Sequence, residues 1–244
     1  MKFKNYYNLE YARLISDKIK TVYPAFADEA FLAGIGQTLK DQEFSERMNL
    51  FAHAIDTLLP SDYRESLNIL RKILGDELKT DSGMFTDGWW LWPIGRYVER
   101  RGIESVEDSL EFIEELTKRF TGEFAVRPLL QYAPETVLKV VEKWSKSDNV
   151  HVRRLSSEGL RIRLPWAKKL DVAVRHFDIY VRILTNLKDD DSRFVQKSVG
   201  NNLNDLYKDY PQKARQIIDG WTTGNPSKAA LWIIGHGLRS AKKK

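Results

Sequence analysis

Two stretches of the sequence set carboxylates among cationic or amide side chains on the surfaces of expected helices. When the first stretch is wound at about 100° per residue, Glu158 lies with Arg154 and Arg161 opposite the apolar face. In the second stretch, Asp205 lies at the edge of the polar face. Ionised carboxylates can stabilise a developing positive charge or act as a general base. The simpler interpretation is a set of exposed Arg–Glu pairs within one helix, each worth about 0.2–0.5 kcal/mol.

The second stretch departs from ordinary helix composition. From Gly200 to Asp205 it contains asparagine, aspartate and glycine, all of which lower helix propensity. Residues of low helix propensity inside a helix whose apolar pattern is otherwise regular often mark a functional position. The side chains expected to point away from the core are Lys197, Asn201, Asn204 and Lys208. Two adjacent repeats would therefore bring carboxylates and cations onto a shared surface.

Cationic residues crowd into the segment 153–169, which includes the first carboxylate. They are Arg153, Arg154, Arg161, Arg163, Lys168 and Lys169, with Arg175 close behind. The segment is a candidate phosphate-tracking stripe, and it has an aromatic residue, Trp166, inside it. A tryptophan that follows a proline is most often a packing plug at a helix junction. The alternative is that Trp166 stacks on a nucleobase or deoxyribose.

Charge is distributed unevenly along the 244 residues. The net charge is +5, but residues 1–122 sum to −5 and residues 123–244 to +10. A basic half beside an acidic half is the pattern expected when one surface meets a polyanion, because neutralised phosphates release counterions. A solvated basic surface without such a partner would show the same asymmetry.

Several classes of protein and site are disfavoured by composition. There are no cysteines, which excludes disulfides and thiolate chemistry and fits a reducing cytoplasm. The four histidines show no metal-ligand spacing, so neither a metal nor another cofactor is expected. No apolar run approaches the roughly 20 residues that span a bilayer. No nucleotide-binding or serine-nucleophile motif occurs. The sequence therefore predicts a soluble, cytoplasmic protein.

The periodicity of apolar residues predicts an all-α chain of about a dozen short helices. Ser105, with Asp108 three residues on, is expected to open a helix from Val106 to Phe120, and Pro134 a helix to about Ser147. Asp148-Asn149-Val150 aligns with Asp191-Ser192-Arg193 at an offset of 43 residues. A shorter third copy begins near Pro226, at an offset of 35.

An offset of 43 lies within the period of HEAT and armadillo repeats, so the fold expected is an α-solenoid of HEAT-like helical repeats with a concave cleft. A single domain is expected over residues 1–244. It would combine acidic N-terminal helices (1–122) with basic repeats (123–244) and end in a basic Lys242-Lys243-Lys244 tail.

Four strings of residues, in order along nearly the whole chain, resemble AlkC-type DNA glycosylases, and more distantly their AlkD relatives. They are Trp92 to Val98, Thr121 to Pro128, Asn149 to Trp166 and Ser198 to Asp209. The resemblance implies hydrolysis of the N-glycosidic bond of cationic bases such as 3-methyladenine and 3-methylcytosine, in bent duplex DNA held in the cleft. It implies no cofactor, no obligate protein partner and no membrane.

The resemblance also implies site residues. The carboxylates of the Glu-Phe-Ala, Ser-Glu-Gly and Asn-Asn-Leu-Asn-Asp motifs match Glu123, Glu158 and Asp205, and the tryptophan of Leu-Pro-Trp matches Trp166. Asp205 and Glu158 would lie beside the deoxyribose and the lesion, with Glu123 supporting them and Trp166 packing on the sugar or the base. The residues expected to hold DNA are Arg127, Arg153, Arg154, Arg161, Arg163, Lys169 and Asn201.

One departure from the family concerns the end of the chain. Many AlkC proteins continue into an immunoglobulin-like domain, whereas this sequence ends at Lys244, as expected of a shorter subgroup. A different hypothesis is a non-catalytic HEAT module that binds unusual DNA structures or a protein partner. The presence of all three carboxylates argues against this second hypothesis.

Overall fold

The computed structural model describes residues 2–243 as helices joined by loops, with no strand in that range. The prediction of an all-α chain is confirmed. The chain divides into two compact units, Met1–Pro128 and Leu129–Lys244. The single domain proposed over the whole chain stays a prediction. None of the described helices is long and apolar enough to cross a membrane.

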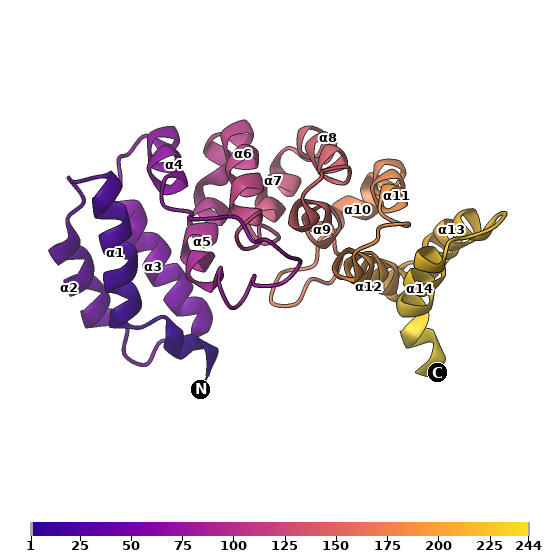
Figure 1. Cartoon of the computed structure of the whole chain (residues 1–244), viewed down its shortest axis with the longest axis horizontal. Coiled ribbons are helices and arrows are strands. Elements are labelled where there is room, and N and C mark those ends of the chain that lie inside the picture. Colours follow the sequence, from indigo (N-terminus) through magenta and orange to yellow (C-terminus); the bar gives the residue numbers. More distant parts are fainter. Residues whose placement is uncertain (1, 244) are drawn as a thin grey trace. The chain divides into compact units, whose positions relative to one another are not determined.

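The described part of the first unit contains six complete α-helices (Figure 1). Each of them buries apolar side chains. They are α1 (Leu9–Val22), α2 (Asp28–Thr38), α3 (Phe44–Leu58), α4 (Tyr63–Arg71), α5 (Trp92–Arg101) and α6 (Val106–Thr117). Short 3₁₀ turns lie at Phe3–Tyr6, Trp89–Leu91 and Gly102–Glu104, and α7 (Val126–Tyr132) runs across the boundary. Helix α6 begins at Val106 as predicted, but it ends at Thr117 instead of Phe120.

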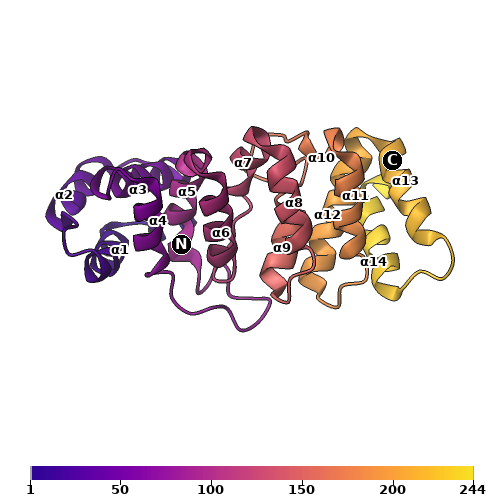
Figure 2. The same ribbon diagram turned by 90° about the horizontal axis from the view of Figure 1, so that it is seen from above.

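The second unit (Figure 2) carries most of the predicted site residues, some on helices and others in the loop between α9 and α10. Its elements are α8 (Pro134–Trp144), α9 (Val150–Glu158), α10 (Val172–Arg175), α11 (Phe177–Asn186), α12 (Arg193–Asp209), α13 (Pro211–Thr222), α14 (Lys228–Gly237) and the 3₁₀ turn η4 (Leu238–Lys243). The side chains of the predicted basic tail, Lys242 to Lys244, lie outside the described residues.

Side-chain caps start the repeated helices at the positions the sequence alignment indicates. Asn149 Oδ1 accepts from the backbone N–H groups of His151 and Val152 at the start of α9. Ser192 and Ser227 cap α12 and α14 in the same way. The first two caps are 43 residues apart and the last two 35 apart, so each predicted repeat begins at a real helix N-terminus.

Helix α12 is the centre of the second unit and packs against α9, α13 and α14. Its glycine is explained by close packing. A Cβ at Gly200 would lie 2.8 Å from His236 Cδ2 and 3.2 Å from the Ile233 carbonyl oxygen, so only glycine lets α14 approach this closely. The unusual helix composition at this position therefore reflects helix–helix packing.

The prediction that Asn204 points away from the core is wrong. Asn204 is only 1% exposed, and its Nδ2 donates to the Gly237 carbonyl at 2.7 Å and to Ser240 Oγ at 3.1 Å. Winding the helix places Asn204 on the polar side correctly, but α14 and η4 cover that side. Buried polar groups need hydrogen-bond partners. The Asn204 amide donates to the carbonyl of Gly237, which is one of the unpaired carbonyls at the C-terminal end of α14.

Candidate active site

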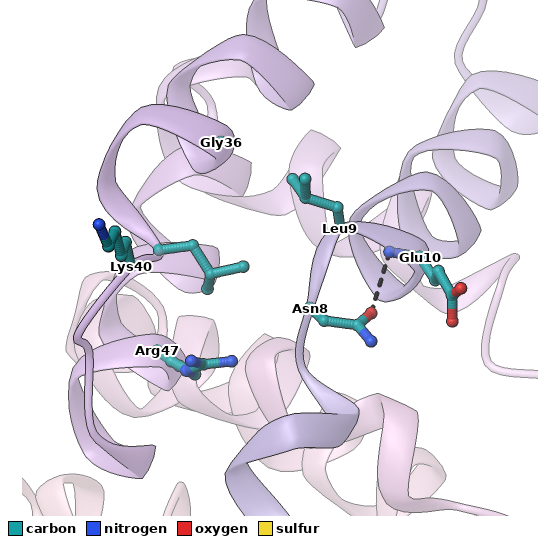
Figure 3. Close-up of a pocket in the computed structure, with 7 residues that line it drawn as sticks. Asn8, Leu9, Glu10, Gly36, Lys40 and Arg47 are labelled. Carbon is teal, nitrogen blue, oxygen red and sulfur yellow. Dashed lines mark hydrogen bonds between the residues drawn. The ribbon is translucent and has the colours of Figure 1, made fainter.

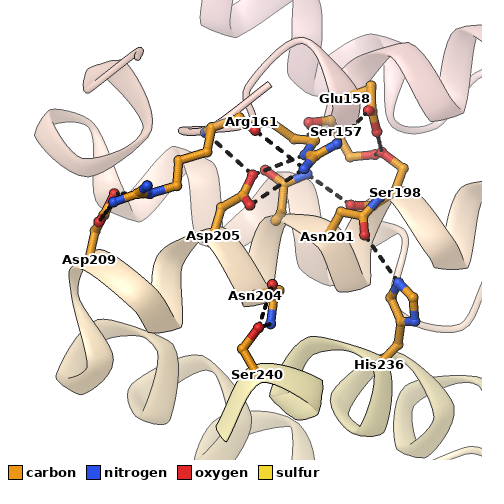
Figure 4. A network of polar contacts seen from close by, with 12 residues as sticks. Ser157, Glu158, Arg161, Ser198, Asn201, Asn204, Asp205, Asp209, His236 and Ser240 are labelled. Carbon is orange, nitrogen blue, oxygen red and sulfur yellow. Dashed lines mark hydrogen bonds and ion pairs between the residues drawn. The ribbon is translucent and has the colours of Figure 1, made fainter. Parts of the chain in front are cut away.

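Arg161, just after α9, joins the two predicted carboxylates of the second unit (Figure 4). Its Nη1 lies 3.0 Å from Glu158 Oε1, and its Nε lies 3.0 Å from Asp205 Oδ2. Its Nη2 makes a longer contact of 3.4 Å with Asp205 Oδ1. Carboxylates from α9 and α12 are therefore held by one planar guanidinium, whose fork of donors suits two acceptors.

These charges are buried, which corrects the interpretation of exposed Arg–Glu pairs. Glu158 is 5%, Asp205 3% and Arg161 8% exposed. The expected Arg154–Glu158 contact within the helix does occur, at 3.4 Å, but both side chains are largely covered. Removing such charges from water is costly unless every partner is present, so this cluster differs in energetics from a solvated helix surface.

Further hydrogen bonds complete the surroundings of both carboxylates. Ser198 Oγ donates to Glu158 Oε2 at 2.6 Å and also lies 2.7 Å from Ser157 Oγ. The backbone N–H of Arg163 donates to Asp205 Oδ2 at 3.3 Å. Within the described part of the chain, Oδ2 of Asp205 thus accepts two bonds, whereas Oδ1 accepts one long contact from Arg161 and keeps room for a further donor.

The balance of burial and charge keeps Glu158 ionised. Burial by itself raises the pKa of the Glu158 carboxyl. The charges of Arg154 and Arg161, followed by the hydrogen bond from Ser198, outweigh burial and hold the pKa below its ordinary value. An ionised carboxylate in a water-poor site acts strongly on nearby positive charge, because little solvent screens it.

A second ion cluster lies near the C-terminal end of α12 and is more exposed. Arg163 forms a bidentate pair with Asp209, at 2.6 and 3.0 Å, and Lys169 lies 3.2 Å from the same carboxylate. Arg163 and Lys169 are about half exposed. Both can reach a ligand while they keep Asp209 as a partner.

The other predicted cations of the second unit have structural contacts. Arg153 pairs with Asp190 at 2.6 Å and donates to the carbonyls of Ser147 and Asp148, so it ties two loops together. Arg154 contacts Glu158 and lies over the ring of Phe194 at 5.1 Å. Arg161 serves the two carboxylates. Contact with phosphate stays a prediction for all three, and their present partners favour a positioning role.

Trp166 is not a packing plug. It is 81% exposed and lies in the loop between α9 and α10. Its backbone has a φ of +63°, the left-handed region that residues other than glycine rarely adopt. The loop is closed by a bond from the Leu170 N–H to the Ile162 carbonyl at 3.1 Å. A large aromatic side chain is therefore presented to solvent on a constrained backbone, an arrangement common at ligand-binding positions.

Glu123 and Arg127 belong to the first unit. Glu123 is buried and accepts a hydrogen bond from the Thr121 hydroxyl. Arg127 is buried as well, and its charge acts on Glu99 of α5. Burial raises the pKa of Glu99, while Arg96 and Arg127 oppose that rise. The convergence of Glu123 with Glu158 and Asp205 stays a prediction.

Further polar side chains of α12 face α9 and were not among the residues predicted from the sequence. Asn202 Nδ2 donates to the carbonyls of Ser157 and Ser198, and its Oδ1 accepts from the buried Tyr180 hydroxyl at 3.1 Å. A signal was present: Ser198, Asn202, Asp205 and Asp209 follow the i, i+4, i+7, i+11 spacing of one helix face. Reading that face as a stripe would have identified Ser198 and Asn202.

A pocket of about 430 Å³ in the first unit contains none of the predicted site residues (Figure 3). It is lined by Asn8, Leu9, Glu10, Gly36, Leu39, Lys40 and Arg47. Arg47 is committed to the backbone there, since it donates to the carbonyls of Lys4, Tyr7 and Gln42. Among the described residues no cluster of acidic or histidine side chains could hold a metal ion.

Comparison with known proteins gives concordant results. A family model described as DNA alkylation repair enzyme matches residues 55–232. A protein of Bacillus subtilis (strain 168), described as uncharacterized protein YhaZ, is 36% identical over 246 residues, covering 99% of this chain and 65% of that protein. The match to the family model, together with this relative, confirms the resemblance predicted from the four strings of residues.

Solved structures show the same relationship. The structure of Pseudomonas fluorescens alkylpurine DNA glycosylase AlkC, bound to DNA containing an abasic site analog, matches with a TM-score of 0.86 and 33% identity. That match covers 99% of this chain and 65% of that chain. AlkD2 from Streptococcus mutans matches with a TM-score of 0.50 and 20% identity over 86% of this chain and 97% of that chain, a likeness of fold alone. The predicted helical-repeat fold is confirmed. The chain spans about 65% of the length of the Bacillus subtilis protein and of the Pseudomonas fluorescens AlkC chain.

Proposed function

Because the chain belongs to the DNA alkylation repair enzyme family, we propose that it is a DNA glycosylase that excises cationic N-alkylated bases from duplex DNA. The lesions proposed are 3-methyladenine and 3-methylcytosine. The observation that carries the proposal is the pair of buried carboxylates, Glu158 and Asp205, held by Arg161 on neighbouring helices. A purely structural repeat would gain little from burying two such groups.

The chemistry of the lesion explains why carboxylates suffice. A base alkylated on a ring nitrogen already carries positive charge, so it leaves as a neutral molecule without a general acid. As the bond from C1′ to the base nitrogen breaks, the deoxyribose becomes cationic and resembles the transition state of glycosidases. Water then adds to C1′, and a carboxylate that acts as general base accepts its proton. An ionised carboxylate beside the sugar lowers the barrier by stabilising its positive charge.

The contacts at the site support separate roles for the two carboxylates. Asp205 Oδ1 keeps hydrogen-bonding capacity, so we assign it to the attacking water or to the sugar. Glu158 has both oxygens occupied by Arg154, Arg161 and Ser198, and so it contributes negative charge at a fixed position. Trp166 is assigned to packing on the sugar or the base, and Glu123 to supporting the pair.

Duplex DNA is the proposed partner. The second half of the chain carries the positive charge, and the Pseudomonas fluorescens relative is bound to DNA in its structure. Arg163 and Lys169 are proposed to contact phosphates directly because their side chains reach solvent. Asn201 and Arg127 are proposed to contribute further contacts.

A time course of base release from methylated duplex DNA tests the proposal without added metal or nucleotide. We expect release by the wild type and a loss of about 10²-fold or more in Asp205→Asn, the range seen when one electrostatic group of an active site is removed. Asp219→Asn, an exposed carboxylate of α13, is the matched control and should release base at the wild-type rate. Tight DNA binding by the wild type without any release would refute a glycosylase and favour the non-catalytic module.

A further inference from the structure

A row of polar side chains on α12 leads toward Asp205. Arg193, Lys197 and Asn201 precede Asp205 at intervals of four residues, so each step moves about 6 Å along the helix and about 40° around it. Arg193 and Lys197 are exposed, Asn201 is half-buried, and Asp205 is buried. The row therefore runs from solvent into the candidate active site.

Helix α14 supplies a second side to this row. The guanidinium of Arg193 lies 4.0 Å from the centroid of the Trp232 ring, and that ring stacks on His236 with centroids 5.0 Å apart and planes 10° from parallel. A cation over an aromatic face loses conformational freedom but keeps its charge. Arg193 is therefore positioned before any ligand arrives.

Asn201 is the junction between the two helices (Figure 4). Its Oδ1 accepts from Arg239 Nη2 at 2.9 Å and contacts His236 Nε2 at 3.1 Å. Arginine can only donate, which identifies this atom as the oxygen and makes His236 Nε2 the donor. Among the described side chains and backbone, the amide nitrogen of Asn201 makes no hydrogen bond, so its two N–H groups can serve a ligand.

The cations of this row differ from those predicted from the sequence. Arg153, Arg161, Arg163 and Lys169 all form ion pairs with aspartate or glutamate. In the described part of the chain, by contrast, Arg193, Lys197 and Arg239 have no acidic partner within ion-pair distance. The pKa of His236 is lowered chiefly by burial. The positive charges of Arg239 and Lys197 lower it further. An uncompensated cationic surface of this kind suits a polyanion.

We propose that Arg193, Lys197, Asn201, His236 and Arg239, here called the α12–α14 stripe, bind the phosphates of a DNA strand on one side of the nucleotide whose sugar lies at Asp205. The inference rests on the proposed function for the identity of the ligand. The stripe binds backbone, which is present in every sequence, and so it sets the register of the lesion without reading bases.

Paired charge-removal variants test the binding of phosphate. Arg193→Ala/Lys197→Ala is compared with Lys139→Ala/Arg215→Ala, which removes two exposed cations of α8 and α13. Affinity for a duplex containing an abasic-site analogue is measured by fluorescence anisotropy over a range of salt. We expect the stripe variant to bind several-fold more weakly, with a slope of log K against log salt shallower by about 2, or about 1 per lost contact. The control variant should match the wild type.

Site-directed cleavage tests the position of the stripe. The chain has no cysteine, so Lys197→Cys provides a single thiol for an iron chelate that cleaves nearby DNA. We expect cleavage within a few nucleotides of the abasic-site analogue on one side only. Arg215→Cys carries the same label as the control, and it should give no cleavage focused at that position.

The outcomes separate this inference from the proposed function. Equal salt slopes for the stripe and control variants, or cleavage from Lys197→Cys spread evenly along the duplex, would overturn the stripe even if the wild type releases methylated bases. Focused cleavage and a shallower slope in a protein that releases no base would support the stripe and refute the glycosylase. A wild type that binds no duplex overturns both.

Discussion

Replacement of Arg161 by methionine provides a sharp test of the electrostatics of the site. The substitution keeps much of the side-chain volume but leaves Glu158 and Asp205 as buried anions without their shared partner. Removing one member of a buried ion pair costs about 3–5 kcal/mol. In a chain of this size that corresponds to a fall in Tm of roughly 6–20 °C.

The loss of stability should depend on pH in a definite direction. In the wild type the pKa of Glu158 is held below its ordinary value, so its ionisation stabilises the fold above the unfolded pKa, and this contribution is lost as pH falls through the folded pKa. Without Arg161, burial dominates and the pKa of Glu158 rises. The destabilisation of Arg161→Met should therefore be largest near neutral pH and shrink in acid, where Glu158 becomes protonated.

The measurement is thermal unfolding of wild type and variant at neutral and at mildly acidic pH. Arg163→Met is the matched control for stability: its side chain is about half exposed and pairs with Asp209 near the surface, so little change is expected. Arg161→Lys serves if the methionine variant does not fold, because lysine keeps the charge but cannot bridge two carboxylates with a planar fork. Equal stability of Arg161→Met and wild type at neutral pH, or a loss that does not vary with pH, would refute the reasoning.

Two further predictions concern packing and the exposed aromatic residue. Gly200→Ala should destabilise the fold by about 1–3 kcal/mol in urea unfolding, because its Cβ would meet α14, whereas Gly235→Ala, with nothing within 4 Å, should be neutral or stabilising. Destabilisation of similar size in both would contradict the packing explanation. Trp166→Ala should leave the unfolding curve almost unchanged, since the side chain is 81% exposed, but should slow base release in a single-turnover assay. An unchanged rate would remove Trp166 from the proposed active site.

Much of the fold follows from local sequence. The caps at Asn149, Ser192 and Ser227 begin helices where the aligned repeats predict them. Winding residues 150–162 also places Glu158 between Arg154 and Arg161 without any tertiary information. Caps and helix faces depend on residues within about four positions, so a single sequence contains what is needed to predict them.

The environment of each charge was decided only by the tertiary structure. The sequence places Arg161 beside Glu158, but only the fold brings it to Asp205, which is 44 residues away along the chain. Asn204 was placed on the correct side of its helix, yet α14 covers that side and buries it. The helical periodicity of the sequence predicts the face of the helix on which a side chain lies. It does not predict which other element packs against that face. Whether a charge is solvated, paired or buried depends on that distant neighbour, and the desolvation cost of several kcal/mol follows from it.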